Sequence, residues 1–141
     1  GEELPSFRQE ARELGLENKV TFTGYKPYAR SFIREFDLLV SASLSEGATP
    51  LTVLEAFAEK TPVLASDTSE NKEAIEDSRN GFLFQSGDAS DLAHKMGAFL
   101  VSQGNEEVTQ SAHELLLSKY RLEQTCENYL TLYRNYLDDG H

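Results

Sequence analysis

The chain has 141 residues, a formal net charge of −11 and a single cysteine, Cys126. This length predicts one domain, and the acidic balance argues against nucleic-acid binding and against contact with anionic lipid. One cysteine excludes an internal disulfide and a cysteine metal cluster. No apolar run approaches the roughly 20 residues that span a bilayer.

Helical and strand patterns alternate along the chain. The spacing of apolar residues, Gly and Pro predicts helices over residues 4–14, 28–36, 50–59 and 69–76, which alternate with strands over 19–23, 37–42, 61–66 and 81–85. Three further helices are predicted over residues 90–101, 106–118 and 121–137. Strands that are separated by helices pair in parallel through right-handed crossovers. The pattern therefore predicts an α/β fold, a Rossmann-like parallel sheet flanked by helices.

The two ends of the chain carry signals of their own. The chain begins at Gly1 with a helix, and four strands are few for such a sheet, so we expect the first strand units to lie upstream of residue 1. Apolar residues of the last helix lie three and four positions apart, which predicts one stripe that is core or a docking face. The stripe comprises Leu122, Cys126, Tyr129, Leu130, Tyr133 and Leu137, and we expect the Cys126 thiol to be inert and partly buried.

The segment 45–55 concentrates the polar chemistry of the chain. Glu46 and Glu55 bracket a turn at Gly47 and the start of a helix, with Thr49 predicted as the N-cap and Pro50 as the first helical residue. The apolar strand 37–42 leads directly into this segment. An acid and free helix amides at the carboxyl end of a parallel strand are typical of an anion or ligand site.

These residues resemble a known family. The run SASLSEGATPLTVLEAFAEKTPVLASD, residues 41–67, resembles the donor-site signature of retaining glycosyltransferases of family 4, which have the GT-B fold. Residues 18–25, 80–83 and 87–93 and the last helix resemble the segments that flank this signature, so the resemblance covers nearly the whole chain. It implies that residues 1–141 form the C-terminal, nucleotide-sugar-binding domain of a two-domain enzyme.

The resemblance also implies roles for individual residues. Glu46 would be the catalytic residue that holds hydroxyls of the donor sugar near the reacting carbon, and Glu55 would accept hydrogen bonds from the ribose. The amides after Glu46 and the dipole of the following helix would hold the diphosphate. The donor-binding set is Glu46, Gly47, Ala48, Thr49, Pro50, Leu51 and Glu55, with Gly24 and Tyr25 beside the nucleobase.

Two positions depart from the family's pattern. Eight residues separate Glu46 from Glu55, one more than is usual, which places an insertion among Ala48 and Thr49. Lys60 stands where the family usually has Gly. A non-Gly residue in the left-handed region costs about 1 kcal/mol, so a different end to this helix is expected.

The remaining polar residues have simpler interpretations. The histidines, His94, His113 and His141, lack metal-ligand spacing, so we expect no metal and no cofactor besides the nucleotide-diphosphate sugar as substrate. Lys26, Arg30 and Arg34 are read as a solvated basic face, with a phosphate role as the alternative. Asp67 with Ser66, Thr68 and Ser69 is read as an N-cap cluster.

The expected function is transfer of a hexose-type sugar from a nucleotide-diphosphate sugar to a saccharide or lipid-linked acceptor, in bacterial polysaccharide biosynthesis. The N-terminal acceptor domain would be absent, so this piece would bind donor weakly without transferring sugar. We expect a cytoplasmic domain with no membrane contact of its own, held at the inner face of the membrane through the missing domain. Two alternatives stay open: another GT-B sugar-nucleotide enzyme (epimerase or phosphorylase), and a non-catalytic module that binds a nucleotide sugar or a protein.

Overall fold

The computed structural model describes residues 3–45, 47, 50–102 and 105–138. Helices and strands follow one another as the sequence predicts, except over residues 19–23. The helices are α1 (Leu4–Glu13), α2 (Arg30–Ile33), α3 (Leu51–Glu59), α4 (Ser69–Ala74), α5 (Ala89–Val101), α6 (Asn105–Lys119) and α7 (Leu122–Asp138). The strands are β1 (Leu39–Ser41), β2 (Val63–Ser66) and β3 (Phe82–Phe84).

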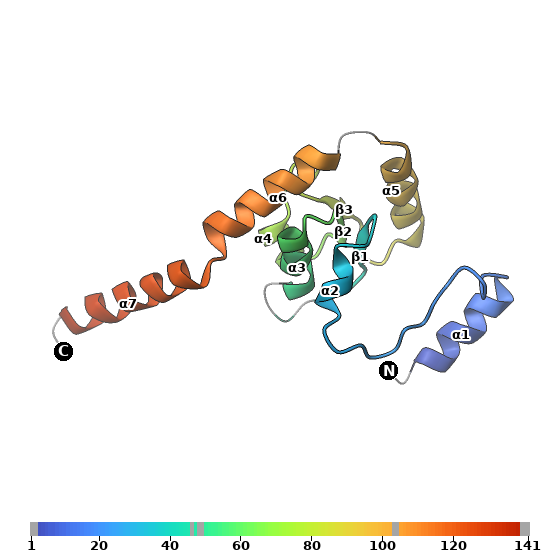
Figure 1. Ribbon diagram of the computed structural model, residues 1–141, viewed down its shortest axis with the longest axis horizontal. Helices are drawn as coiled ribbons and strands as arrows, with labels where there is room; N and C mark the ends of the chain where they lie inside the picture. The colour runs from blue at the N-terminus through green and yellow to red at the C-terminus, as the bar shows by residue number, and fades with distance from the viewer. Residues whose placement is uncertain (1–2, 46, 48–49, 103–104, 139–141) are drawn as a thin grey trace.

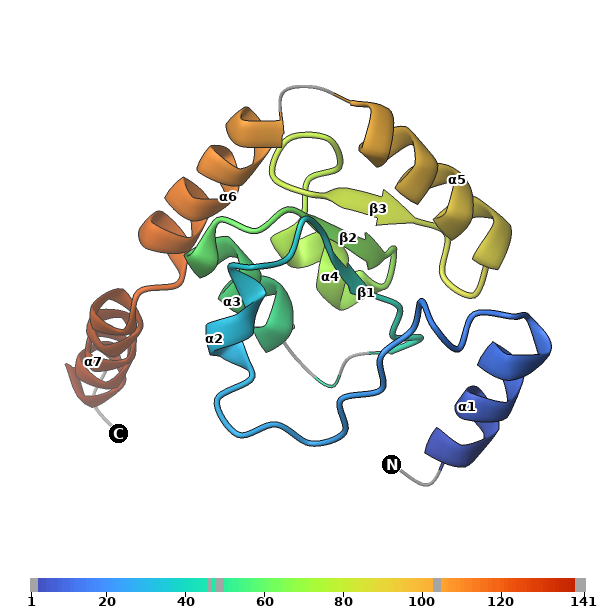
Figure 2. The ribbon, with the colours of Figure 1, turned by 45° about the vertical axis from the view of Figure 1, so that its right-hand side comes forward.

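The three strands form one parallel sheet in the order β1-β2-β3. Leu39 pairs with Val63 in the first ladder and Leu64 with Phe82 in the second. Helices α3 and α4 lie on one side of the sheet with α6 beyond them, and α5 lies on the other side (Figures 1 and 2). The predicted α/β architecture with a parallel sheet is confirmed.

The prediction of a strand over residues 19–23 is wrong. Residues 20–26 have no regular secondary structure, and α1 with the chain that follows it lies apart from the sheet (Figure 1). A strand needs a neighbouring strand to accept and donate its backbone hydrogen bonds. β1 is an edge strand among the described residues, with Val40 38% exposed, but the 20–26 segment does not reach it.

The hydrophobic core lies between α3 and the central strand. Val53, Ala56 and Phe57 on α3 are completely buried. Val63 and Ala65 on β2 are buried to the same degree and belong to the same core cluster. β2 is buried along its whole length, as a strand covered on both faces must be. This core holds α3 rigidly against the sheet and so positions its first turn.

The ends of two helices follow local sequence signals. α1 ends at Glu13, two residues before Gly15, which has a φ of +66°. Lys60 ends α3 in the left-handed region with a φ of +56°, so the helix keeps the usual left-handed end although the residue is not Gly. The expectation of an altered helix end at Lys60 is therefore wrong, and the backbone strain falls on a lysine.

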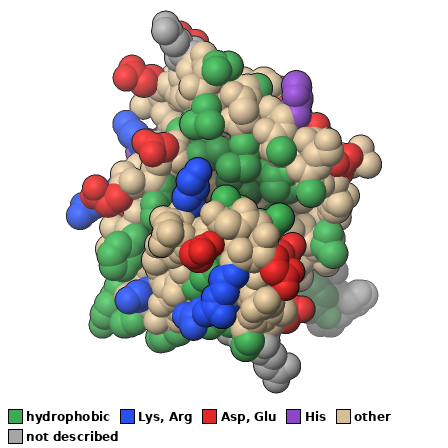
Figure 3. Space-filling view, turned by 90° about the vertical axis from the view of Figure 1, so that its right-hand side faces the viewer, with side chains coloured by type: hydrophobic (Ala, Val, Ile, Leu, Met, Phe, Trp, Pro, Cys, Tyr) green, Lys and Arg blue, Asp and Glu red, His purple; other side chains and the backbone are tan. Residues whose placement is uncertain are grey.

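Helix α7 extends away from the sheet (Figure 1). Its predicted apolar stripe is exposed, with Tyr129 and Tyr133 among its solvent-facing side chains, and the Cys126 thiol is exposed instead of partly buried. The stripe is thus not core, because α7 packs against no element that would cover it among the described residues. Apolar side chains also gather in the open on the face beside α5 and α1 (Figure 3).

Candidate functional site

The carboxyl ends of the three strands meet at one edge of the sheet. β1 ends at Ser41, β2 at Ser66 and β3 at Phe84, and the strands run in the same direction. The segment that leaves β1 at this edge carries the paired-glutamate motif. Ligands of open α/β sheets bind at this edge. The topology therefore brings the motif to the place where a ligand site is expected.

The structure describes only part of the motif. Glu46, Ala48 and Thr49 lie outside the described residues. Gly47 and Leu51 are exposed, which leaves their backbones open to a ligand.

The start of α3 differs by one residue from the prediction. Pro50 is the N-cap and not the first helical residue, because its ψ of 93° is extended. The Pro50 carbonyl accepts the amides of Val53 at 3.0 Å and Leu54 at 3.2 Å. The amides of Leu51 and Thr52 come before Val53, the first amide that bonds to this carbonyl, so no carbonyl within the helix can satisfy them. Two donors are thereby directed to the carboxyl edge of the sheet.

A hollow of about 400 Å³, here called the Glu55 groove, joins two segments that are distant in sequence. Its walls include Thr23, Gly24, Ile33, Phe36, Thr52 and Glu55. Gly24 has a φ of +63°, which a side chain rarely tolerates, so glycine suits this turn. The structure thus brings together Gly24 and Glu55, both predicted from sequence. The Tyr25 ring does not line the groove and is 92% exposed.

The Glu55 carboxylate has the environment of a binding group. It is half-buried, and it has no hydrogen-bond or ion-pair partner among the residues that the structure describes. A second hollow, of about 350 Å³, touches Glu55 from the side of Leu51, Leu54 and Tyr120. A carboxylate held by a rigid helix between two hollows can accept hydrogen bonds from hydroxyl groups of a ligand.

The basic residues near the groove are exposed, as predicted for a solvated face. The Arg30 guanidinium contacts the Glu59 carboxylate at 3.3 Å, and Arg34 contacts its neighbour Glu35 at the same distance. Exposed pairs of this kind stabilise a protein little. Lys26 and Arg30 both line the Glu55 groove, and because Arg30 is paired with Glu59, Lys26 is the basic side chain better placed for a ligand there.

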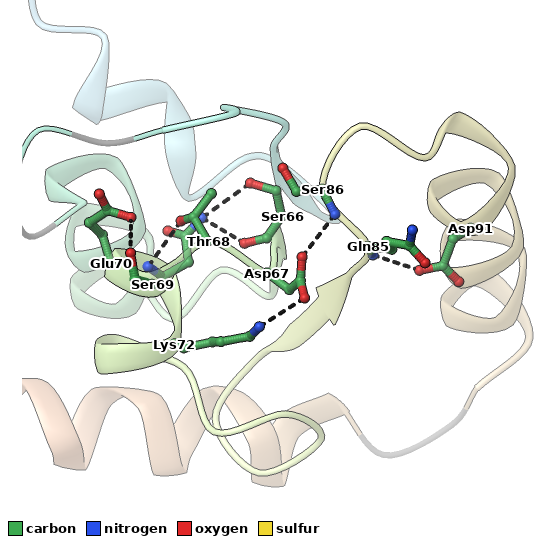
Figure 4. Close-up of polar contacts among 10 residues, drawn as sticks. Ser66, Asp67, Thr68, Ser69, Glu70, Lys72, Gln85, Ser86 and Asp91 are labelled. Atoms are coloured by element: carbon green, nitrogen blue, oxygen red, sulfur yellow. Dashed lines mark hydrogen bonds and ion pairs between the residues drawn. The ribbon is translucent and has the colours of Figure 1, made fainter.

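The predicted N-cap cluster at residues 66–69 is confirmed at Thr68, which caps α4, whereas Asp67 makes other contacts. The Thr68 hydroxyl accepts the amide of Asn71 at 3.3 Å. The Asp67 carboxylate accepts the amide of Ser86 at 2.9 Å and pairs with Lys72 at 2.8 Å (Figure 4). The Lys72 ammonium and the Ser86 amide lower the pKa of Asp67 below its usual 3.8. Asp67 therefore ties β2 to β3 at the carboxyl edge.

Two neighbouring polar groups complete this edge. The backbone amide of Glu70 and the Ser69 hydroxyl lower the pKa of the Glu70 carboxyl. No sequence pattern singled out Asn71, which is completely buried and donates to the Ser66 carbonyl at 2.8 Å. Its one available signal is its place three residues after a Thr cap, and that signal is weak because Asn is itself common at helix starts.

The histidines that the structure describes, His94 and His113, take no part in the Glu55 groove. The His113 Nδ1 lies 3.1 Å from the Phe57 carbonyl, which places it in a structural contact between α6 and α3. Within residues 3–45, 47, 50–102 and 105–138, no group of three His, Cys, Asp or Glu side chains could hold a metal ion. No helix in the same ranges is both long and apolar enough to cross a membrane.

Known proteins resemble this chain in sequence. Residues 1–102 match the family described as glycosyl transferases group 1. The chain is 27% identical over 94% of its length to the lipopolysaccharide core biosynthesis glycosyltransferase LpsE of Rhizobium meliloti. It is 32% identical over 87% of its length to the poly(ribitol-phosphate) alpha-N-acetylglucosaminyltransferase of Staphylococcus aureus. The chain spans 39% of the first relative and 25% of the second.

Several solved structures have the same fold as this chain. The C-terminal domain of a group 1 glycosyl transferase, LpcC of Francisella tularensis, superimposes with a TM-score of 0.75 at 26% identity, over 86% of this chain and 65% of that one. A mutant of S. aureus TarM, crystallised with fondaparinux, α-GlcNAc-glycerol and UDP, superimposes with a TM-score of 0.84 at 28% identity, over 93% of this chain and 27% of that one. Anabaena HepE in complex with UDP-glucose reaches 0.82 at 22% identity, over 91% of this chain and 36% of that one.

Proposed function

This chain belongs to the group 1 family of glycosyl transferases and has the α/β fold of a GT-B enzyme, and on that basis we propose that it is the donor-binding domain of a retaining hexosyltransferase. The proposed reaction moves a hexose-type sugar from a nucleotide-diphosphate sugar to a saccharide or lipid-linked acceptor. The sequence relative from Rhizobium meliloti acts in lipopolysaccharide core biosynthesis, which supports a role in bacterial polysaccharide synthesis. The proposed place of action is the cytoplasm.

The observation that carries the proposal is the Glu55 carboxylate. It is half-buried and unpaired among the described residues, and it shares a groove of about 400 Å³ with Gly24. A ribose presents two neighbouring hydroxyl donors, and charge-assisted hydrogen bonds to a carboxylate are roughly twice as strong as neutral ones. Gly24 leaves room beside its backbone for a flat base, because no side chain projects there. We therefore assign the ribose to Glu55 and the base to the Gly24 side of the groove.

The first turn of α3 supports a site for the diphosphate. The amides of Leu51 and Thr52 have no acceptor within the helix, and the helix dipole adds partial positive charge at the same end. Negative charge builds on the diphosphate as the bond to the sugar breaks, so donors that are already oriented stabilise the transition state. The proposed order along the site is base, ribose at Glu55, and diphosphate at the start of α3.

Glu46 keeps its role from the family signature. It precedes the start of α3 in the chain, on the segment that leaves the carboxyl end of β1. We propose that its carboxylate holds hydroxyls of the donor sugar near the reacting carbon. The neighbouring positions Gly47, Ala48, Thr49 and Pro50 belong to the proposed donor-binding set. Tyr25 is kept in this set as the residue next to Gly24, although its ring lies outside the groove.

A uracil nucleotide is the first candidate among donors. TarM, which is 28% identical to this chain over the matched region, was crystallised with UDP. The matched region covers 93% of this chain.

The proposal includes a second domain that supplies the acceptor site. The chain spans less than half of its sequence relatives, and the exposed apolar side chains of α7 have no cover among the described residues. Contiguous exposed apolar patches mark interaction surfaces. We therefore expect these 141 residues to bind donor weakly and to show no turnover of a nucleotide sugar with an acceptor.

Calorimetric titration of the chain with UDP-, GDP- and ADP-sugars tests the proposal. Glu55→Gln keeps the shape of the side chain but removes its charge, and it should weaken binding of the preferred nucleotide sugar about tenfold. Glu73→Gln makes the same change on α4, outside the groove, and should leave the affinity unchanged.

Other outcomes separate the alternatives. If none of the nucleotide sugars binds, or if both variants bind as the unmodified chain does, the donor-site proposal fails. If the nucleotide sugar binds and the enzyme with its acceptor domain yields an epimerised or phosphorolysed sugar, the chain belongs to another class of GT-B sugar-nucleotide enzyme. Binding without any product in the complete enzyme would indicate a non-catalytic module.

A further inference from the structure

Asn71 holds a buried polar atom that the fold leaves unsatisfied. The side chain is completely buried, yet its Oδ1 has no hydrogen-bond partner among the described residues. A buried acceptor without a donor destabilises a protein, whereas an apolar residue of similar size would avoid this penalty. All polar contacts that this amide makes among the described residues therefore come from its nitrogen.

The other half of the amide is committed to Ser66. Asn71 Nδ2 donates to the Ser66 carbonyl at 2.8 Å and lies 3.4 Å from the Ser66 hydroxyl oxygen. The Ser66 hydroxyl donates its proton to the carbonyl of Ser43, so it can only accept from Asn71. This order fixes the amide with the nitrogen toward Ser66 and the free oxygen away from it.

The chain of hydrogen bonds leads to the segment after β1. Ser43 lies two residues beyond the end of β1 and three before Glu46 in the sequence. Ser66 ends β2, and Thr68 caps the start of α4 (Figure 4). Asn71 lies in the first turn of α4, three residues after Thr68. Helix α4 is thus connected through β2 to the backbone that enters the proposed donor site.

We propose that Ser66 and Asn71 are positioning residues for donor binding. They hold the Ser43 carbonyl and thereby set the direction in which the chain leaves β1. The inference rests on the proposed function, since it needs a donor at this edge. It predicts that loss of these hydrogen bonds raises the Kd for the nucleotide sugar, whereas loss of a buried asparagine elsewhere lowers only Tm.

A matched pair of asparagines tests this inference. Asn80 is also buried, but both halves of its amide are bonded, to the Ala74 carbonyl at 3.1 Å and from the Glu76 amide at 2.8 Å. Asn80→Ala should lower Tm and leave the affinity for the nucleotide sugar unchanged. Asn71→Ala should lower Tm less and raise the Kd for the same nucleotide sugar about tenfold.

A double-mutant cycle adds a second readout. Ser66→Ala should raise the Kd as Asn71→Ala does, and the double variant should be no weaker than either, because both act through the Ser43 carbonyl. If Ser66→Ala does not fold, Ser66→Cys replaces it in the experiment. Cysteine is close to serine in size, but its thiol is a weaker hydrogen-bond donor than the hydroxyl.

Two results would overturn the inference. If the unmodified chain binds a nucleotide sugar and the Ser66 and Asn71 variants bind it within twofold of the same Kd, these residues are structural only. If the unmodified chain binds none, the proposed function falls and this inference falls with it.

Discussion

The carboxylate of Asp67 accepts a hydrogen bond from the backbone amide of Ser86 at 2.9 Å. The two residues lie just beyond the carboxyl ends of β2 and β3, and Lys72 completes the contact from α4 at 2.8 Å (Figure 4). The contact holds two strand ends of the sheet together at the edge where the ligand site is proposed. It also provides a titratable group whose contribution to stability can be followed by pH.

Asp67→Asn should destabilise the chain at neutral pH and much less in acid. Lys72 and the Ser86 amide lower the pKa of Asp67 in the folded state below 3.8, its value in the unfolded chain. A lowered folded-state pKa contributes stability that is present above pH 3.8 and is lost as the pH falls through the folded-state pKa. Urea unfolding of both proteins at pH 7 and at pH values below 3.8 measures this. A difference that does not change with pH would contradict the assignment.

Phe57→Ala should destabilise the chain by about 3–5 kcal/mol. Phe57 is completely buried on α3 between the sheet and α6, so its removal leaves a cavity in the core. Leu100→Ala, at an exposed position of α5, is the control and should change the free energy of unfolding by less than about 0.5 kcal/mol. If Phe57→Ala and Leu100→Ala lowered the free energy of unfolding in urea equally, Phe57 would not be part of the core.

Lys60→Gly should stabilise the chain by about 1 kcal/mol. Lys60 has a φ of +56° at the end of α3, a conformation that disfavours every residue with a Cβ. The variant also loses the exposed hydrogen bond from Lys60 Nζ to Gln110, but this loss offsets little of the gain in stability. Thermal unfolding of the variant measures the change, and a lower Tm than that of the unmodified chain would show that α3 does not end in this conformation.

Tyr129→Ser and Tyr133→Ser should leave the free energy of unfolding within about 0.5 kcal/mol of its original value. Both rings are exposed on α7, so folding does not bury them in this chain. The same changes should reduce self-association in light scattering, because exposed apolar surface promotes it. Ile75 is buried, so Ile75→Ala is the contrasting variant and should unfold at a lower urea concentration than the unmodified chain. Loss of stability in the tyrosine variants would mean that α7 packs against the domain.

Features that depend on local chemistry could be predicted from the amino-acid sequence. Helix starts and ends at Asp88 and Gly15 follow from a capping carboxylate and from a residue without Cβ. The alternation of apolar runs determined the parallel α/β class, and the motif around Glu46 and Glu55 pointed to a glycosyl transferase before any fold was known. These signals lie within one element or one turn, so the neighbouring residues contain all that is needed to read them.

Contacts between segments that are distant in the sequence depend on the packing of the folded chain. This packing left residues 19–23 outside the sheet, since a strand forms only where a partner strand comes within hydrogen-bonding distance. It placed Gly24 beside Glu55 and joined Asp67 to Ser86. It also buried Asn71 against Ser66, an environment that no local pattern announces. Each of these depends on which surfaces pack together, and the hydrophobic effect that drives packing is not directional enough to be read from one segment alone.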